Sequence, residues 1–159
     1  MAIVLREVSR ETADAILAGT RPESVRVADD YPTEFSAGMA QAVGTEGQFH
    51  YLVHRLEDDL VVGEIGAAFV DEQGTIEIGY AIVGPQQNRG YATAAVEALV
   101  ARLREATEVR RFVAHTPFDR PESARVVEKA GFAMARETDD ADEAGTVLRV
   151  KEWELVELE

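Results

Sequence analysis

Hydrophobic and polar residues alternate in several short runs of this chain, a pattern typical of half-buried β-strands. The first run covers residues 3–9. Three further runs lie between Gln48 and Val83, namely QFHYLVHRLE, LVVGEIGAAFV and TIEIGYAIV, and turn-forming residues separate them. We therefore expect an antiparallel meander in this part of the chain. The last two runs, FAMARE and VLRVKEWELV, predict a terminal hairpin with an acidic loop, Thr138 to Gly145, at its tip.

A change of period after the meander predicts a long helix. From Ala92 to Ala106 the apolar residues recur at the spacing of one face of an amphipathic helix. Three shorter helices are expected at residues 10–18, 34–43 and 121–130. For the last of these, Asp119 and Glu122 are placed to cap the start, while Gly131 and Phe132 fit a Schellman-type stop.

One more strand is expected from Arg111 to Thr116, between the two helices of the second half. Together the elements predict a mixed sheet with helices on it, an α+β (mixed α/β) fold. The 159 residues fit one domain, 1–159, because no linker or internal repeat divides them.

Composition and charge narrow the possible functions. The net charge of −14 argues against a nucleic-acid partner, and residues 137–159 hold nine acids against Arg149 and Lys151. No apolar run has the roughly 18 residues of a membrane helix, so we expect no membrane association and a cytoplasmic location. The chain has no cysteine, which excludes disulfides and a thiol nucleophile. His50 and His54 share a strand face without an evident third ligand, so we expect no metal.

The segment IEIGYAIVGPQQNRGYAT, residues 76–93, carries the clearest chemical signal. It runs from a strand through a short loop into the long helix, and free N–H groups at a helix start bind phosphate without a lysine. Gly90 allows close approach of the backbone, and Ala92 leaves room beside it. Neither a GxxxxGK[ST] loop nor a GxGxxG motif is present. The alternative is a helix start without a ligand.

The pattern Gln-x-x-Gly-x-Ala, formed by Gln87, Gly90 and Ala92, resembles the pyrophosphate loop of the GNAT acetyltransferase superfamily. The flanking IGYAIVGP and GYATAAVEALV, and SARVVEKAGF further on, are similar to the branch that contains ribosomal-protein N-terminal acetyltransferases. The resemblance covers residues 50–135 closely. It implies a mixed sheet of about seven strands, splayed between the fourth and fifth, with about four helices.

The resemblance also implies a binding mode for acetyl-coenzyme A, and no metal. The pantetheine arm would pair with backbone near Ile82 and Val83, and one of these N–H groups would meet the oxyanion of the thioester. Arg120 replaces an asparagine of the family and is a candidate contact for a phosphate of coenzyme A. The pyrophosphate would lie on the N–H groups of Gln87, Asn88, Arg89, Gly90, Tyr91, Ala92 and Thr93.

Two catalytic residues follow from the same resemblance. Glu77 matches a glutamate that accepts the proton of the amine, commonly through water; the alternative is an ion pair across the sheet with an Arg or Lys. Val127 stands where many relatives have an acid tyrosine, so Ser123 is expected to hydrogen-bond the departing sulfur. The alternative for Ser123 is an ordinary helix-start serine. His115 is an alternative base, although a half-buried structural histidine is favoured.

The acceptor pocket of such enzymes would be framed here by two acidic segments, Asp29 to Tyr31 and Thr138 to Glu143. We therefore expect a cationic amine, such as a peptide N-terminus, a polyamine or an amino sugar. Deprotonation at pH 7 costs about 1.4 kcal/mol for an α-amino group and about 4.6 kcal/mol for a lysine-type amine. Transfer is expected to be direct, in a ternary complex, and a homodimer is possible. The rivals are a non-catalytic acyl-CoA-binding or sensor domain and a structural or interaction protein.

Overall fold

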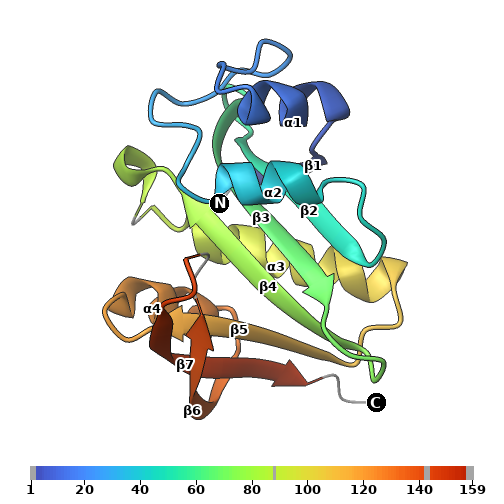
Figure 1. The fold of residues 1–159 in the computed structure, drawn as a ribbon, viewed down its shortest axis with the longest axis vertical. Coiled ribbons are helices and arrows are strands. Elements are labelled where there is room, and N and C mark those ends of the chain that lie inside the picture. Colours follow the sequence, from blue (N-terminus) through green and yellow to red (C-terminus); the bar gives the residue numbers. More distant parts are fainter. Residues whose placement is uncertain (1–2, 88, 142–143, 157–159) are drawn as a thin grey trace.

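Seven strands form one mixed sheet that carries helices on both faces (Figure 1). The computed structural model describes residues 3–87, 89–141 and 144–156. The strands are β1 (Ile3–Glu7), β2 (Gln48–Arg55), β3 (Leu60–Phe69), β4 (Thr75–Ile82), β5 (Arg111–Pro117), β6 (Ala133–Ala141) and β7 (Val147–Val156). The helices are α1 (Arg10–Leu17), α2 (Ser36–Ala42), α3 (Tyr91–Ala106) and α4 (Pro121–Lys129), with a 3-10 turn, η1, at Gly84–Gln86.

The strand order is β1-β2-β3-β4-β5-β7-β6, antiparallel throughout except for the parallel pair β4 and β5. The predicted meander is β2, β3 and β4, and the predicted terminal hairpin is β6 and β7. The α+β class is therefore confirmed, together with the seven strands and four α-helices.

The tip of the hairpin was predicted wrongly. Residues 138–141 continue β6 and pair with Val147 to Val150, so the connection is shorter than the expected acidic loop. The reason is that β6 is an edge strand exposed on both faces, with charged side chains at most of its last positions. Such a strand has no buried face, so its sequence does not alternate.

Helix α4 ends as the sequence indicates but begins differently. Gly131 has φ 99°, its N–H bonds to Glu128 O, and the N–H of buried Phe132 bonds to Val127 O, which is a Schellman stop. At the other end the described residues contain no side-chain cap, so the capping prediction for Asp119 and Glu122 was wrong. Pro121 opens the helix and has no N–H to satisfy.

The sheet buries two separate apolar layers. On one face, the isoleucines of β4 at positions 76, 78 and 82 pack against the apolar side of α3. On the other face, a smaller cluster joins α1, α2 and the segment between them to β2 and β3. Side chains of a strand alternate between faces, so Glu77 and Gly79 of β4 lie on the face opposite α3.

Strands β4 and β5 pair over only four positions, from Thr75 opposite Arg111 to Ile78 opposite Ala114. Beyond Ile78, β4 continues along β3, while β5 continues along β7. The inner edges of the two strands therefore diverge within the sheet, as the predicted splay requires.

Candidate active site

A cavity of about 530 Å³ lies along the last residues of β4, where they no longer pair with β5. This volume is within the range of small-molecule sites, about 300–1,000 Å³. Four segments line it: the end of β4, the start of α3, the first turns of α4, and the loop before α2. The lining residues are Asp30, Pro32 to Phe35, Tyr80 to Gly84, Gln86, Gln87, Gly90 to Thr93, Arg120, Glu122, Ser123, Arg125, Val126 and Lys129.

The exposed edge of β4 supplies main-chain groups to this cavity. The N–H of Val83 donates to Val62 O of β3 at 3.0 Å. Of the two N–H groups predicted to meet the oxyanion, that of Val83 is therefore already in use. Backbone groups of successive strand residues point to opposite sides. Those of Ile82 and Tyr80 therefore point away from β3, toward the gap left by β5. Ile82 remains the candidate donor, and Tyr80 is a lining residue that the sequence analysis missed.

The start of α3 presents to the same cavity N–H groups that have no acceptor inside the helix. Gly90 precedes the helix with φ 83°, in the left-handed region that favours glycine. The first intrahelical bond runs from Ala94 N to Gly90 O at 3.0 Å. The N–H groups of Tyr91, Ala92 and Thr93 therefore have no acceptor inside the helix, and all three residues line the cavity. This arrangement suits the phosphate groups of a ligand.

The other residues of the expected phosphate loop differ from that picture. The N–H of Gln87 donates to Gly84 O at 3.2 Å, so this main-chain donor already has an acceptor within the loop. Its side chain lies at the cavity instead and donates to Ile82 O at 2.9 Å, which ties the loop to the end of β4. Arg89 is exposed and does not belong to the described cavity lining. Asn88 lies outside the described residues.

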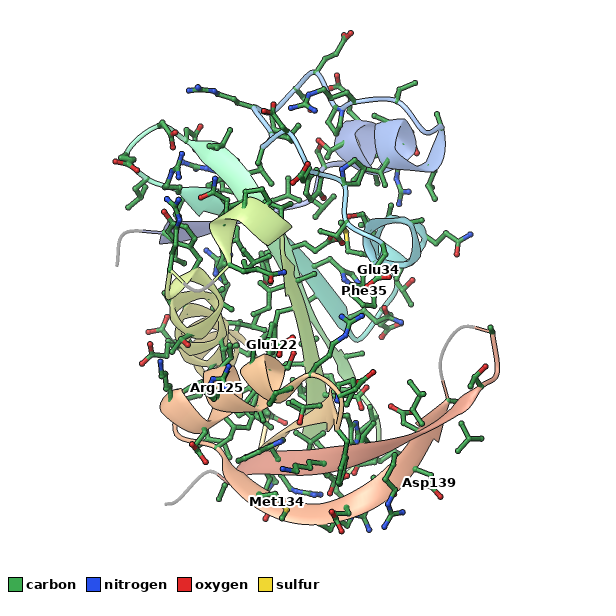
Figure 2. All side chains as sticks on the ribbon, turned by 90° about the vertical axis from the view of Figure 1, so that its left-hand side faces the viewer. Glu34, Phe35, Glu122, Arg125, Met134 and Asp139 are labelled. Atoms are coloured by element: carbon green, nitrogen blue, oxygen red, sulfur yellow. The ribbon has the colours of Figure 1, made fainter. Side chains whose placement is uncertain are left out.

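The two ends of the cavity carry opposite charge. On the α4 side the lining holds three basic residues and one acid, Arg120, Arg125, Lys129 and Glu122, so this side is net positive, whereas the loop before α2 supplies Asp30 and Glu34. Figure 2 shows the two groups on either side of β4, with Glu34 and Phe35 on one side and Glu122 and Arg125 on the other. Arg120 Nη2 lies 3.3 Å from Glu34 Oε1, so the two ends meet at this ion pair. The basic end suits phosphates, and the acidic end suits a cation.

Ser123 lines the cavity and is tied to β4. Tyr80 Oη donates to Ser123 O at 2.8 Å, and burial raises the pKa of Tyr80, so its hydroxyl stays protonated. This bond holds the start of α4 against the diverging strand while the Ser123 hydroxyl remains at the cavity. Val127, one turn further on, is fully buried in the core. Its aliphatic side chain cannot donate a proton to the departing sulfur.

Glu77 lies below the cavity, outside the described lining, with its side chain 42% exposed on the face opposite α3. Its partner is His115, whose Nδ1 lies 2.5 Å from Glu77 Oε1, and not an Arg or Lys as in the alternative to the base role. On its other side, His115 Nε2 lies 3.0 Å from Glu152 Oε1. The hydrogen bond with Glu77, assisted by that with Glu152, outweighs burial and raises the pKa of His115 to about 9. A protonated imidazole has no free lone pair, so His115 is poorly suited as a base.

Glu152 connects this pair to two arginines. Arg136 Nε lies 3.1 Å from Glu152 Oε2, and Arg111 Nη2 lies 3.4 Å from the same oxygen. Burial raises the pKa of Glu152, but the hydrogen bonds from His115 and Arg136 outweigh it and the pKa is lowered. Glu152 is therefore a fixed negative charge that keeps His115 protonated.

The acidic hairpin contributes less to the site than expected. None of the described hairpin residues 138–141 belongs to the cavity lining, and Asp139 pairs with Arg149 at 3.0 Å. Asp142 and Glu143, the other predicted acids of this tip, lie outside the described residues. In the first acidic segment, Asp30 lines the cavity, whereas Tyr31 is buried.

The described residues lack both a metal-binding cluster and a membrane-spanning helix. Within the described chain, His, Asp and Glu side chains nowhere gather in a group of three or more that suits a metal ion. The described helices also include none with the length and apolar character needed to cross a membrane.

Comparison with known proteins gives the family. Residues 2–133 match the family described as an acetyltransferase (GNAT) domain. No curated protein matches the sequence. A GNAT-family acetyltransferase from Bacillus anthracis has a similar structure, with a TM-score of 0.71, 18% identity, and 98% of this chain and 95% of that chain covered. Spermidine N-acetyltransferase from Vibrio cholerae, solved with CoA and spermine, gives a TM-score of 0.68 at 12% identity, with 97% and 95% covered.

These structural likenesses agree with the mixed sheet described above. The family match covers most of the sequence, including the segment from Glu77 to Thr93 that carries the expected phosphate loop. The chain belongs to the GNAT family of acetyltransferases.

Proposed function

We propose that this protein transfers the acetyl group of acetyl-CoA directly to a primary amine of a cationic acceptor, with both substrates bound together. The observation that carries the proposal is the cavity along the unpaired edge of β4, which has N–H groups of α3 and basic residues at one end and acidic residues at the other. A phosphate-bearing ligand can therefore occupy one end of the cavity while a cationic amine occupies the other.

Coenzyme A fits the residues of this cavity. Its phosphates would lie against the start of α3 and near Arg120 and Arg125, and its extended arm would run along Tyr80 and Ile82. Acetyl-CoA supplies a thioester, whose carbonyl oxygen becomes negative when an amine attacks. The N–H of Ile82 is the donor proposed to meet that charge.

The proton of the amine needs an acceptor on the other face of β4. Glu77 lies on that face, exposed enough to contact water, and we assign it as the base that acts through water. The amine nitrogen forms the new C–N bond, and the C–S bond breaks with its electron pair on sulfur. Ser123 donates a hydrogen bond to that sulfur. The thiolate then takes a proton from solvent, which is undemanding because its conjugate thiol has a pKa of about 8.5.

The finer identity of the acceptor follows from charge. Asp30 and Glu34 at the cavity favour a cation, and a peptide N-terminus or a small polyamine meets that requirement. The ribosomal-protein branch suggested by sequence motifs and the spermidine enzymes among the structural neighbours represent these two classes. The homodimer remains a prediction.

The test is calorimetry with acetyl-CoA followed by a free-thiol release assay over peptides with free N-termini, diamines and monoamines. Binding together with amine-dependent thiol release supports the proposal. Coenzyme binding with no turnover on any amine would favour the acyl-CoA sensor, which Val127 and the Arg120–Glu34 ion pair also suit. The absence of coenzyme binding would overturn both readings.

Direct transfer has its own kinetic signature. A ternary complex gives double-reciprocal plots that intersect when both substrates are varied, whereas a covalent acetyl-enzyme gives parallel lines. The chain has no cysteine to carry an acetyl group, so intersecting lines are expected.

A further inference from the structure

A buried carboxylate lies directly behind the acceptor side of the cavity. Glu64 of β3 is only 4% exposed and pairs in register with Ala81 of β4, which lines the cavity. Thr33, which lines the cavity from the loop before α2, donates its hydroxyl to Glu64 Oε1 at 2.8 Å. Glu64 is therefore separated from the acceptor end by a single layer of residues.

Both hydroxyl partners of Glu64 use the same oxygen. Ser36 also donates to Oε1, so Oε2 is buried and has no hydrogen-bond partner among the residues that the structure describes. Tyr31 Oη is likewise buried and unpartnered within the described chain. Burial raises the pKa of Tyr31 most, the charge of Glu64 raises it further, and Ser36 opposes the rise.

Leaving such groups unpaired is costly. A buried polar atom without a hydrogen bond destabilises a fold, and folded proteins retain few of them. Here two unpaired oxygens occur together, next to the wall of a cavity that needs a substrate. A single ligand with hydrogen-bond donors for both oxygens would remove this cost.

The chemistry of the two oxygens selects that ligand. A carboxylate oxygen accepts hydrogen bonds, a phenol oxygen also accepts, and a primary ammonium carries N–H donors for both. Burial raises the pKa of Glu64, although the hydrogen bonds from Ser36 and Thr33 oppose the rise, so its carboxylate needs a cation beside it more than an anion. A neutral alcohol offers only one donor. An ammonium bound to a buried carboxylate stays protonated, because an opposite charge favours the charged form. It therefore cannot be the nitrogen that attacks the thioester.

We propose that Glu64 and Tyr31 bind the second, non-reacting ammonium group of a diamine or polyamine acceptor. The ammonium takes the unpaired Oε2 of Glu64 and the Tyr31 oxygen when the wall formed by Pro32 and Thr33 shifts aside. The inference rests on the proposed function, and it narrows the cationic acceptor to one with two amines. It also explains why Glu64 is buried with one oxygen that lacks a partner among the described residues.

The experiment compares diamines with monoamines of matched length. The probes are 1,3-diaminopropane, 1,4-diaminobutane and 1,5-diaminopentane, each against the n-alkylamine of the same carbon number. In the unaltered protein we expect at least one diamine to have a higher kcat/KM than its monoamine. In Glu64→Gln we expect the KM of that diamine to rise about 10- to 100-fold, the loss of a hydrogen bond to a charged group. The KM values of the monoamine and of acetyl-CoA should stay within about twofold.

Matched variants separate binding from folding. Tyr31→Phe removes only the hydroxyl and should raise the diamine KM less than Glu64→Gln does. Glu72→Gln changes an exposed acid in the turn before β4 and should leave every KM unchanged. Thermal unfolding of each variant shows whether it is folded at the assay temperature.

Each outcome decides one proposal. Turnover of monoamines and diamines with equal efficiency, or a diamine preference that survives in Glu64→Gln, would overturn the inference and leave the proposed function intact. If no amine is acetylated, calorimetric binding of the diamines to the CoA-loaded protein still tests Glu64. Binding that is lost in Glu64→Gln keeps the site, and binding that is unchanged removes it.

Discussion

At the scale of single residues, His115 is held by two carboxylates and is positively charged at neutral pH. Its pKa of about 9 in the folded protein lies above the ordinary value of 6.5, so the folded state binds the proton more tightly than the unfolded state. The stability that follows from this is fully present below pH 6.5 and is lost as the pH rises through about 9.

We expect His115→Gln to abolish this dependence. Between pH 6.5 and 9 the melting temperature of the unaltered protein should fall relative to that of the variant, as measured by circular dichroism. Glu152→Gln, which removes one of the two partners, should give an intermediate slope. Parallel curves for all three proteins would show that His115 is not held in its charged form.

Glu77 gives a second prediction at this scale, because its proposed role is chemical. Glu77→Gln keeps the size of the side chain and removes the basic oxygen, so kcat should fall about 100-fold or more, the usual contribution of a general base. KM for acetyl-CoA should not change, because Glu77 lies outside the described cavity lining. An unaltered kcat would reduce Glu77 to a structural partner of His115.

At the scale of elements, the start of α3 depends on the left-handed backbone of Gly90. A β-branched residue is strained at this φ, and its side chain would stand where a phosphate must approach. Gly90→Val should therefore lower the affinity for CoA at least about tenfold, as measured by calorimetry. Gly19→Val is the matched control, because Gly19 also has a positive φ, 73°, but ends α1 with open space around it. The control should lose stability and keep its affinity, and equal affinity losses in both variants would contradict the assignment.

The elements also show what the sequence predicts well and what it does not. Apolar runs identified β2, β3, β4 and β7, because each packs at least one face on a core, and β2 and β3 pack on both. The end of β6 was missed because an edge strand exposed on both faces carries no alternation. The left-handed backbone that precedes α3 could be predicted from Gly90, since a local backbone requirement leaves a local signal.

Long-range features of the site left no such signal. The N–H groups of Val83 and Gln87 are used by Val62 and Gly84, a fact that depends on strand pairing and loop closure. Glu64 reads as an ordinary strand acid, and its burial arises only when the segment before α2 folds over it. The pairing of Glu77 with His115 likewise needs the parallel register of β4 and β5.

At the scale of the whole molecule, a net charge of −14 surrounds a cavity with one acidic end. A cationic acceptor is attracted by that field, and salt screens the attraction over a Debye length of about 10 Å at 0.1 M. KM for a diamine should therefore rise as sodium chloride increases from about 0.02 to 0.5 M. The rise should be smaller in Asp30→Asn/Glu34→Gln, whose charges lie at the cavity.

The hairpin acids provide the comparison. Asp139→Asn/Asp140→Asn removes the same amount of charge from β6, which lies outside the described lining. If the cavity acids dominate, this variant keeps most of the salt dependence. Equal effects of the two variants would show that only the total charge matters, and no effect of either would leave the acids as a solvated surface.

Because β4 diverges from β5, an unpaired strand edge lies in the middle of the sheet instead of at its outer edge. Rim edges need charges, bulges or short lengths to prevent other chains from adding to them. Here the loop before α2 and the first turns of α4 lie on either side of the exposed edge of β4. These two segments keep other strands from pairing with that edge. A ligand must be thin and extended to lie along this edge, so the shape of the cavity selects ligands before any charged or polar group does.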